Sequence, residues 1–269
     1  MIDPKLQAEL RAKYNPDGSV LRRAQIEMLD LLSFIDRICK ENNLRYWLDS
    51  GTLIGAVRHG GFIPWDDDID ICMPKNDARR LKEIMGDKIW NNHIVLQTNE
   101  TDPKYVNSSW MTIRDTNSEY VSDLYSHSML KYRGLQVDVF IMEEGIPLWL
   151  LKVSSKLHSC FVFSPLNNKH GLGWLKSTVF FNYKILTKFI YPFFSVFKGR
   201  NSQISSGFGA VYMKVQNIET VYPLKKIKFE NNEFLCPNKP VEYLSKLYGD
   251  WATLPKKIKT HNVSIKFYS

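Results

Sequence analysis

The sequence of 269 residues has little cysteine and lacks a long uninterrupted apolar run. Its four cysteines, at positions 39, 72, 160 and 236, have neither the spacing of a zinc site nor the density of a disulfide framework. We therefore expect reduced thiols. The first residues are charged and lack the apolar segment of a secretory signal, which together with the thiols predicts a cytoplasmic protein.

An acidic surplus is also absent, because 36 Lys and Arg outnumber 28 Asp and Glu and give a net charge of +8. This charge suits an anionic partner such as a nucleotide, an acidic glycan, a nucleic acid or the cytoplasmic face of a membrane. The chain lacks a dense basic run and RNP-type motifs, so no nucleic acid is expected as a partner. An apolar content of 44% is enough for a substantial core in one large or two modest domains.

Against this basic background, residues 51–70 read GTLIGAVRHGGFIPWDDDID, with four aspartates in the last five positions. Neighbouring carboxylates repel one another, and burying them unpaired is costly or raises their pKa values. A hard divalent cation with oxygen ligands is the simplest partner for an ordered run of this kind. The run therefore predicts a metal site, with a solvated acidic loop as the alternative.

The apolar pattern of the first half predicts alternating helices and strands. Helical spacing over 20–39 predicts a long helix, and Asn76 is a credible N-cap for another. The remaining elements expected are strands at 45–49, 68–73, 105–115 and 134–141, a short helix at 52–58 and a helix at 77–85. This order predicts an α/β (α+β) fold, a mixed sheet flanked by helices, with a catalytic core over residues 1–145.

The second half has a different character. After Pro147, aromatic-rich apolar stretches with interspersed lysines predict two helices, the second of about 24 residues starting at Trp174, where the lysines argue against a membrane span. Such helices can lie on a bilayer surface or cover the core. We assign 146–225 to a helical, substrate- or membrane-proximal insertion. A hairpin around Asn231-Asn232 and a last helix, within 226–269, are expected to pack back on the core.

The residues around the acidic run suggest a chemistry. Asp66, Asp68 and Asp70 would share one face of a strand, because side chains alternate, so two of them can bind the same ion. Gly51 and Thr52 can offer backbone N–H groups and a hydroxyl to a phosphate at the start of a helix. A phosphate site beside a carboxylate-held metal is typical of phosphoryl transfer.

A third acid would have to come from elsewhere in the fold. Asp138 in GLQVDVFI lies on the strand face opposite the aliphatic residues, where it can complete a metal site and accept a proton, or simply face water. Arg58, His59 and Arg114 are candidates to bind phosphate oxygens. A surface position for His59 and an exposed ion pair of Arg114 with Asp115 are the alternatives.

With these residues in view, YWLDSGTLIGAVRHGGFIPWDDDIDICMP resembles the signature of the LicD family, bacterial relatives of the fukutin-type proteins. Further matches are LLSFIDRICKENN, GLQVDVF, and KFENNEFLCPNKPVEYLSKLYGDW followed by Pro255 and His261. The resemblance covers most of 20–145 and returns near 226–261. Residues 75–78, Lys-Asn-Asp-Ala, depart from the Arg-x-Asp-Tyr-like stretch expected there, and 146–225 lacks a family motif.

The resemblance implies a nucleotidyltransferase-like fold and metal-dependent transfer of phosphocholine, or a related phospho-polyol, from a CDP-linked donor. CDP-choline is the expected donor, and the acceptor is a hydroxyl of a cell-surface glycan or its lipid-linked precursor. The family pattern assigns the donor phosphate to Gly51 and Thr52, Mg²⁺ (or Mn²⁺) to Asp68 and Asp70, and the third acidic position to Asp138. The other expected substrate-binding residues are Arg58, His59, Asp66 and Arg114.

Two other classes of function stay open at this point. One is a nucleotidyltransferase acting on RNA or a small molecule, and the other is a catalytically inactive relative that binds glycan. Contact with the inner membrane face is compatible with each of them. A quaternary ammonium group would bind aromatic faces, for which the candidates are Trp47, Trp65, Tyr105 and Trp110. The sequence does not choose between choline, glycerol and ribitol head groups.

Overall fold

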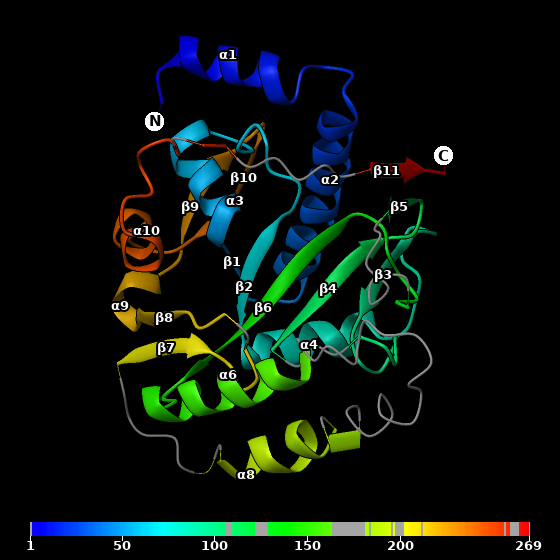
Figure 1. The fold of residues 1–269 in the computed structure, drawn as a ribbon, viewed down its shortest axis with the longest axis vertical. Coiled ribbons are helices and arrows are strands. Elements are labelled where there is room, and N and C mark those ends of the chain that lie inside the picture. Colours follow the sequence, from blue (N-terminus) through cyan, green and yellow to red (C-terminus); the bar gives the residue numbers. More distant parts are fainter. Residues whose placement is uncertain are drawn as a thin grey trace.

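The fold belongs to the α/β class, as expected, with a mixed sheet flanked by helices (Figure 1). The computed structural model describes residues 2–105, 109–121, 129–162, 181–182, 184–194, 196, 202–210, 212–255, 257–258 and 264–268.

The central sheet brings together strands that are far apart in the sequence. Its main order is β1-β2-β6-β4-β3, and β7 and β8 extend it from β6. The strands are β1 (Trp47–Leu48), β2 (Asp70–Pro74), β3 (Ile94–Gln97), β4 (Trp110–Asp115), β6 (Gln136–Glu144), β7 (Gln203–Ser206) and β8 (Val215–Asn217). Only β2 and β6 pair in parallel among these strands, and their register sets Asp70 opposite Asp138.

The two faces of this sheet differ in polarity. Helices α2 (Val20–Glu41) and α4 (Lys75–Met85) pack against β2, β4 and β6. On β6, Val137 and Val139 are fully buried, whereas Asp138 between them is half-buried on the opposite face. Because side chains alternate along a strand, the sheet has one face in the core and one that is free to form a site.

The remaining elements surround this sheet. They are α1 (Pro4–Tyr14), α3 (Ser50–Ile54), η1 (Gly55–His59), β5 (Ser118–Val121), α6 (Leu148–Val162), η3 (Leu186–Ile190), α8 (Tyr191–Phe194), α9 (Ile218–Val221), β9 (Lys225–Phe229), β10 (Asn232–Cys236), α10 (Pro240–Tyr248) and β11 (Ser264–Phe267). From the C-terminal part, Phe229, Phe234 and Tyr243 belong to the same core cluster as the apolar face of α2. These C-terminal elements therefore complete the core.

Several predicted elements are confirmed with shifted boundaries. The strand expected at 68–73 begins only at Asp70, because pairing with β6 starts there. The helix expected from Asp77 starts at Lys75, so Asn76 lies inside it and does not cap it. The predicted turn of the hairpin was also wrong by one residue. Phe229 pairs with Asn232, so that Glu230, with φ of +54°, and Asn231 form the turn.

The second half is less helical than expected. The first predicted helix is confirmed as α6. Of the second, residues 181–182 and 184–194 are helical and include η3 and α8, as predicted, while 163–180 lie outside the described residues. Strands β7 and β8 were not predicted, because alternation over three or four residues is a weak signal. Within the described part of the chain, none of the helices combines the length and apolarity that crossing a bilayer requires.

Candidate active site

The acidic run and Asp138 meet on the open face of the sheet. The backbone N–H of Asp138 donates to the carbonyl of Ile69 at 2.8 Å, and Ile69 is fully buried. Asp68 and Asp70, on either side of Ile69, therefore point away from the core, and both are half-buried. Their carboxylates and that of Asp138 lie close enough to act on one another's charge.

The electrostatics of this cluster oppose full ionisation. Burial, and then repulsion by neighbouring aspartates, raises the pKa values of Asp68 and Asp70 well above the usual range. Burial also raises the pKa of Asp138, against the opposing attraction of Arg114. Burial and then the neighbouring aspartates raise the pKa of Asp66 to about 7. A cation placed among these groups would stabilise their charged forms.

The donor set suits a hard cation that also binds substrate oxygens. Among the described residues, no group of three or more His, Cys, Asp or Glu side chains is gathered in an arrangement that could hold a metal ion. Mg²⁺ does not need such a cage, because it is usually held by one or two carboxylates together with water and substrate phosphates. Asp68 and Asp70 are enough for that chemistry, and both the bound cation and Asp138 as its third ligand stay predictions.

Neighbouring side chains fix the orientation of Asp138. Thr112 Oγ1 on β4 donates to Asp138 Oδ1 at 2.7 Å, and Gln136 Nε2 donates to Oδ2 at 3.0 Å. Tyr105 Oη lies 2.8 Å from Thr112 Oγ1 and extends the network away from the site. Since both carboxylate oxygens accept a hydrogen bond, Asp138 is held in one rotamer. Sequence reasoning did not identify Thr112 or Gln136.

The Gly51-Thr52 turn packs directly against the acidic run. A Cβ atom at Gly51 would lie 2.7 Å from Asp66 Oδ2, so any larger residue would displace that carboxylate. Thr52 Oγ1 accepts a hydrogen bond of 2.9 Å from the backbone N–H of Asp70. The hydroxyl thus ties α3 to the start of β2 and retains its own proton for donation. The assignment of both residues to a phosphate stays a prediction.

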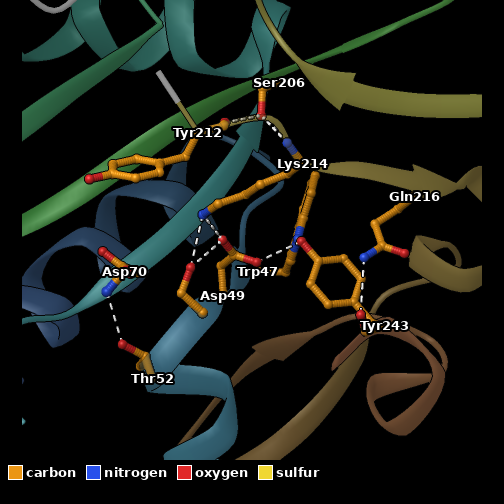
Figure 2. A network of polar contacts seen from close by, with 10 residues as sticks. Trp47, Asp49, Thr52, Asp70, Ser206, Tyr212, Lys214, Gln216 and Tyr243 are labelled. Carbon is orange, nitrogen blue, oxygen red and sulfur yellow. Dashed lines mark hydrogen bonds and ion pairs between the residues drawn. The ribbon is translucent and has the colours of Figure 1, made fainter. Parts of the chain in front are cut away.

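A buried ion pair that the sequence analysis missed lies beside this turn (Figure 2). Lys214, in the loop between β7 and β8, forms an ion pair with the fully buried Asp49, which directly precedes α3. Tyr243 Oη donates to Asp49 Oδ1 at 2.6 Å, and Ser50 Oγ donates to Oδ2 at 2.9 Å. Lys214 Nζ also lies 3.6 Å from the centroid of the Phe140 ring.

Charge attraction keeps both members of this pair ionised. Burial acts to raise the pKa of Asp49, but the attraction and hydrogen bonds of Lys214, together with Tyr243, outweigh it and leave that pKa below the usual value. Burial acts to lower the pKa of Lys214, yet Asp49 and Asp70 raise it overall. Lys214 also attracts Asp68, Asp70 and Asp138, so the same ammonium group serves the acidic cluster.

Arg58 and His59 contact other parts of the protein. Arg58 Nη1 donates to the carbonyl of Trp251 at 2.7 Å, and its Nε donates to His59 Nε2 at 2.9 Å. His59 Nδ1 lies 2.5 Å from Gln7 Oε1. Burial, and then the charge of Arg58, lowers the pKa of His59 to about 4, so its ring is neutral at pH 7. Arg58 acts electrostatically on Asp66, and a phosphate-binding role for either residue stays a prediction.

Arg114 is buried behind Asp138. Its Nε donates to Gln97 Oε1 and its Nη1 to the carbonyl of Gly134, both at 2.8 Å. Its charge acts on Asp138 from this position. The alternative of an exposed ion pair with Asp115 is wrong, because that carboxylate is itself buried and contacts His93 at 2.8 Å.

Fold and site define an α/β protein with a Gly-Thr turn, an acidic strand and a further aspartate on the adjacent parallel strand. Residues 43–144 match the model of the family described as LicD/FKTN/FKRP, nucleotidyltransferase domain. This match confirms that residues 43–144 resemble the LicD family, as the sequence motifs predicted. This range includes every site residue predicted from the sequence, whereas Lys214 lies outside it.

Three relatives illustrate the similarity. The lipopolysaccharide cholinephosphotransferase LicD of Haemophilus influenzae is 26% identical over 261 residues, covering 87% of this chain and 92% of that protein. An uncharacterized protein of Rickettsia prowazekii is 38% identical over 80 residues, covering 30% of this chain and 29% of its own length. The ribitol 5-phosphate transferase FKRP of Mus musculus is 36% identical over 53 residues, covering 20% of this chain and 11% of that protein.

Replacing Lys214 with Met should destabilise the fold by leaving Asp49 buried without its cation. We expect the free energy of unfolding to fall by about 3–5 kcal/mol, the usual cost of removing one partner of a buried ion pair. Urea denaturation followed by circular dichroism measures this loss. The double variant Asp49→Asn/Lys214→Met should recover part of it, and Lys88→Met at an exposed position should change stability by less than about 0.5 kcal/mol. A negligible loss in Lys214→Met would contradict the role of the pair.

The metal-free protein should lose stability as the pH rises toward neutrality. The pKa of Asp66 is about 7 in the fold against a usual 3.8, so between these values the folded state binds the proton more tightly than the unfolded chain. The free energy of unfolding therefore falls as the pH rises from about 4 to about 7. Thermal unfolding in EDTA at a series of pH values tests this. Asp66→Asn should flatten the slope and the exposed Asp87→Asn should keep it, whereas equal slopes in all three proteins would contradict the assignment.

Proposed function

We propose that this protein catalyses the metal-dependent transfer of phosphocholine, or a related phospho-polyol, from a CDP-linked donor to a hydroxyl of a cell-surface glycan or its lipid-linked precursor. The observation that carries the proposal is the strand register that sets Asp70 opposite Asp138 on the open face of the sheet. The names of the relatives support it, because one is a cholinephosphotransferase and another a ribitol 5-phosphate transferase. We place the reaction in the cytoplasm.

In the proposed reaction, an acceptor hydroxyl attacks the choline-bearing phosphorus of CDP-choline. The new bond joins the acceptor oxygen to that phosphorus, and the bond to the oxygen of CMP breaks. Asp138 orients the hydroxyl and accepts its proton as a general base. Thr112 and Gln136 hold the carboxylate in place for this step.

The other side of the site would bind the pyrophosphate of the donor. The first turn of a helix leaves backbone N–H groups without intrahelical partners, so Gly51 and Thr52 at the start of α3 can donate to phosphate oxygens. Mg²⁺ held by Asp68 and Asp70 would neutralise charge on the phosphates and on the leaving CMP. Lys214 attracts the same carboxylates from the protein side and so limits their mutual repulsion.

An aromatic surface next to Asp138 favours choline among the head groups. Trp110 lies opposite Phe140 in the β4–β6 register, two residues along each strand from Thr112 and Asp138, which is about 7 Å. The two rings are in contact, with centroids 5.7 Å apart. Trp110 is half-buried on the site face and can bind a quaternary ammonium group.

The other aromatic candidates suit this role less well. Trp47 is fully buried and donates to Tyr243 Oη, and Tyr105 is buried behind Thr112. Trp65 packs against Tyr14. Trp110 is therefore the residue that we assign to the head group.

Purified protein incubated with Mg²⁺, a glycan acceptor and a panel of CDP-choline, CDP-glycerol and CDP-ribitol should release CMP from CDP-choline. Asp68→Asn and Asp138→Asn should each lower kcat by about 100-fold or more, with folding intact by circular dichroism. The exposed Asp87→Asn is the matched control and should retain full turnover. Unchanged turnover in Asp138→Asn would contradict its role. A chain that releases no CMP from any donor would instead fit the inactive glycan-binding alternative.

Replacing Trp110 with Leu should weaken binding of the choline head group selectively. We expect KM for CDP-choline to rise by about 5- to 30-fold, the loss of a cation–π contact worth about 1–2 kcal/mol, with little change for CDP-ribitol. Steady-state kinetics with both donors measures the difference. Trp149→Leu, on the exposed side of α6, serves as the control and should leave both values unchanged. An equal rise in KM for both donors would mean that Trp110 supports the packing of the site and does not bind the choline head group.

A further inference from the structure

The positive charge of this chain is concentrated in one segment. From Gly145 to Ile218 the sequence contains nine Lys and Arg and neither Asp nor Glu. Removing these nine from the 36 basic residues leaves 27 against 28 acidic residues in the rest of the chain, so the net charge of +8 resides in this segment. In the described part of this segment, Lys152, Lys156, Lys184 and Lys188 are exposed, so the exposed charged side chains there have one sign.

Helix α6, within this segment, has two distinct faces. Leu150, Leu151 and His158 are buried, and the two leucines pack with Ile146 and Phe208 in a small core of their own. The opposite side, which we call the outer face of α6, consists of Trp149, Lys152, Val153, Lys156 and Leu157. Trp149 is 63% exposed, Val153 49% and Leu157 45%. These residues recur at steps of three and four, so they form one stripe of apolar groups and lysines.

The described residues that follow in the chain repeat this composition. Phe189 and Phe193 are each 64% exposed, and Lys184 and Lys188 are exposed near them in the sequence. Figure 1 places α8 at the same end of the molecule as α6, opposite the end that carries α1. Exposed aromatic residues therefore accompany exposed lysines at this end in both segments.

We propose that the outer face of α6 binds the surface of an anionic lipid bilayer. Its exposed apolar side chains would enter the boundary between head groups and acyl chains, while Lys152 and Lys156 reach the anionic head groups. The exposed apolar side chains between the lysines favour an anionic membrane over an acidic protein patch, which would attract the lysines but leave these apolar groups in contact with polar surface. The proposed contact is peripheral, because it is made by the side chains on one face of α6. This proposal is independent of the proposed function.

The same architecture couples this face to the acidic site. The turn between β7 and β8 carries Phe208, which packs against the buried side of α6, and Lys214, which pairs with Asp49. Ser206 Oγ, at the start of the turn, accepts the backbone N–H of Lys214 at 2.9 Å and closes it. A bilayer bound to α6 would thus be held at a fixed distance from the acidic cluster.

Sedimentation with lipid vesicles tests the proposal on the full chain. We expect binding to phosphatidylcholine vesicles that contain phosphatidylglycerol, and much weaker binding to phosphatidylcholine alone. Lys152→Glu/Lys156→Glu should weaken binding to the anionic vesicles by about 30-fold or more, since each lysine near such a surface contributes about a factor of five. Trp149→Ala should weaken binding as well, and brominated lipids should quench tryptophan fluorescence less in that variant.

The matched control is Lys5→Glu/Lys13→Glu, which makes the same change of charge at exposed positions on α1. It should leave vesicle binding within a factor of about three of the unmodified chain, because α1 lies at the opposite end of the molecule (Figure 1). Equal losses in the two double variants would mean that vesicle binding depends on the net charge of the chain and not on α6, and would overturn the proposal. So would the absence of vesicle binding. A dimer in sedimentation velocity that is lost in Trp149→Ala would assign the face to a second copy of the chain.

Discussion

Repulsion between carboxylates is the constraint on which the rest of this structure depends. The β2–β6 register places Asp70 opposite Asp138, and Asp66 and Asp68 approach the same face from the preceding loop. Each of these groups has a raised pKa, first because of burial. Holding such groups together lowers the stability of the fold, a cost that the proposed binding of a cation would offset.

The protein offsets part of this repulsion with a lysine from a distant segment. Lys214 is 165 residues away from Asp49 in the sequence, yet its ammonium group is buried between Asp49 and the acidic cluster. Because Asp49 already neutralises it, Lys214 cannot supply a full compensating charge to Asp68, Asp70 and Asp138. The cluster therefore stays short of positive charge, which is the basis for the proposed cation. The turn that carries Lys214 also packs on α6, which links the charge balance of the site to the basic segment.

The parts of the fold that follow from local sequence could be predicted. The alternation in GLQVDVFI placed Asp138 opposite the buried Val137 and Val139, and the spacing over 20–39 identified α2. Contacts between distant segments could not be predicted in this way. Lys214 lies in a stretch without a motif, and the burial of Arg114 depends on Gln97 and Gly134 from other parts of the fold. The one available signal for Asp49 was an acid placed directly after the apolar pair Trp47–Leu48.

The central claim is that Asp68, Asp70 and Asp138 together bind a divalent cation beside the donor phosphates. Titration of Mn²⁺ in the presence of CDP-choline, followed by electron paramagnetic resonance, tests it most directly. The account predicts one bound Mn²⁺ per chain, with affinity lowered at least tenfold in Asp70→Asn and in Asp138→Asn. Equal Mn²⁺ affinity in these variants and in the unmodified chain would contradict it.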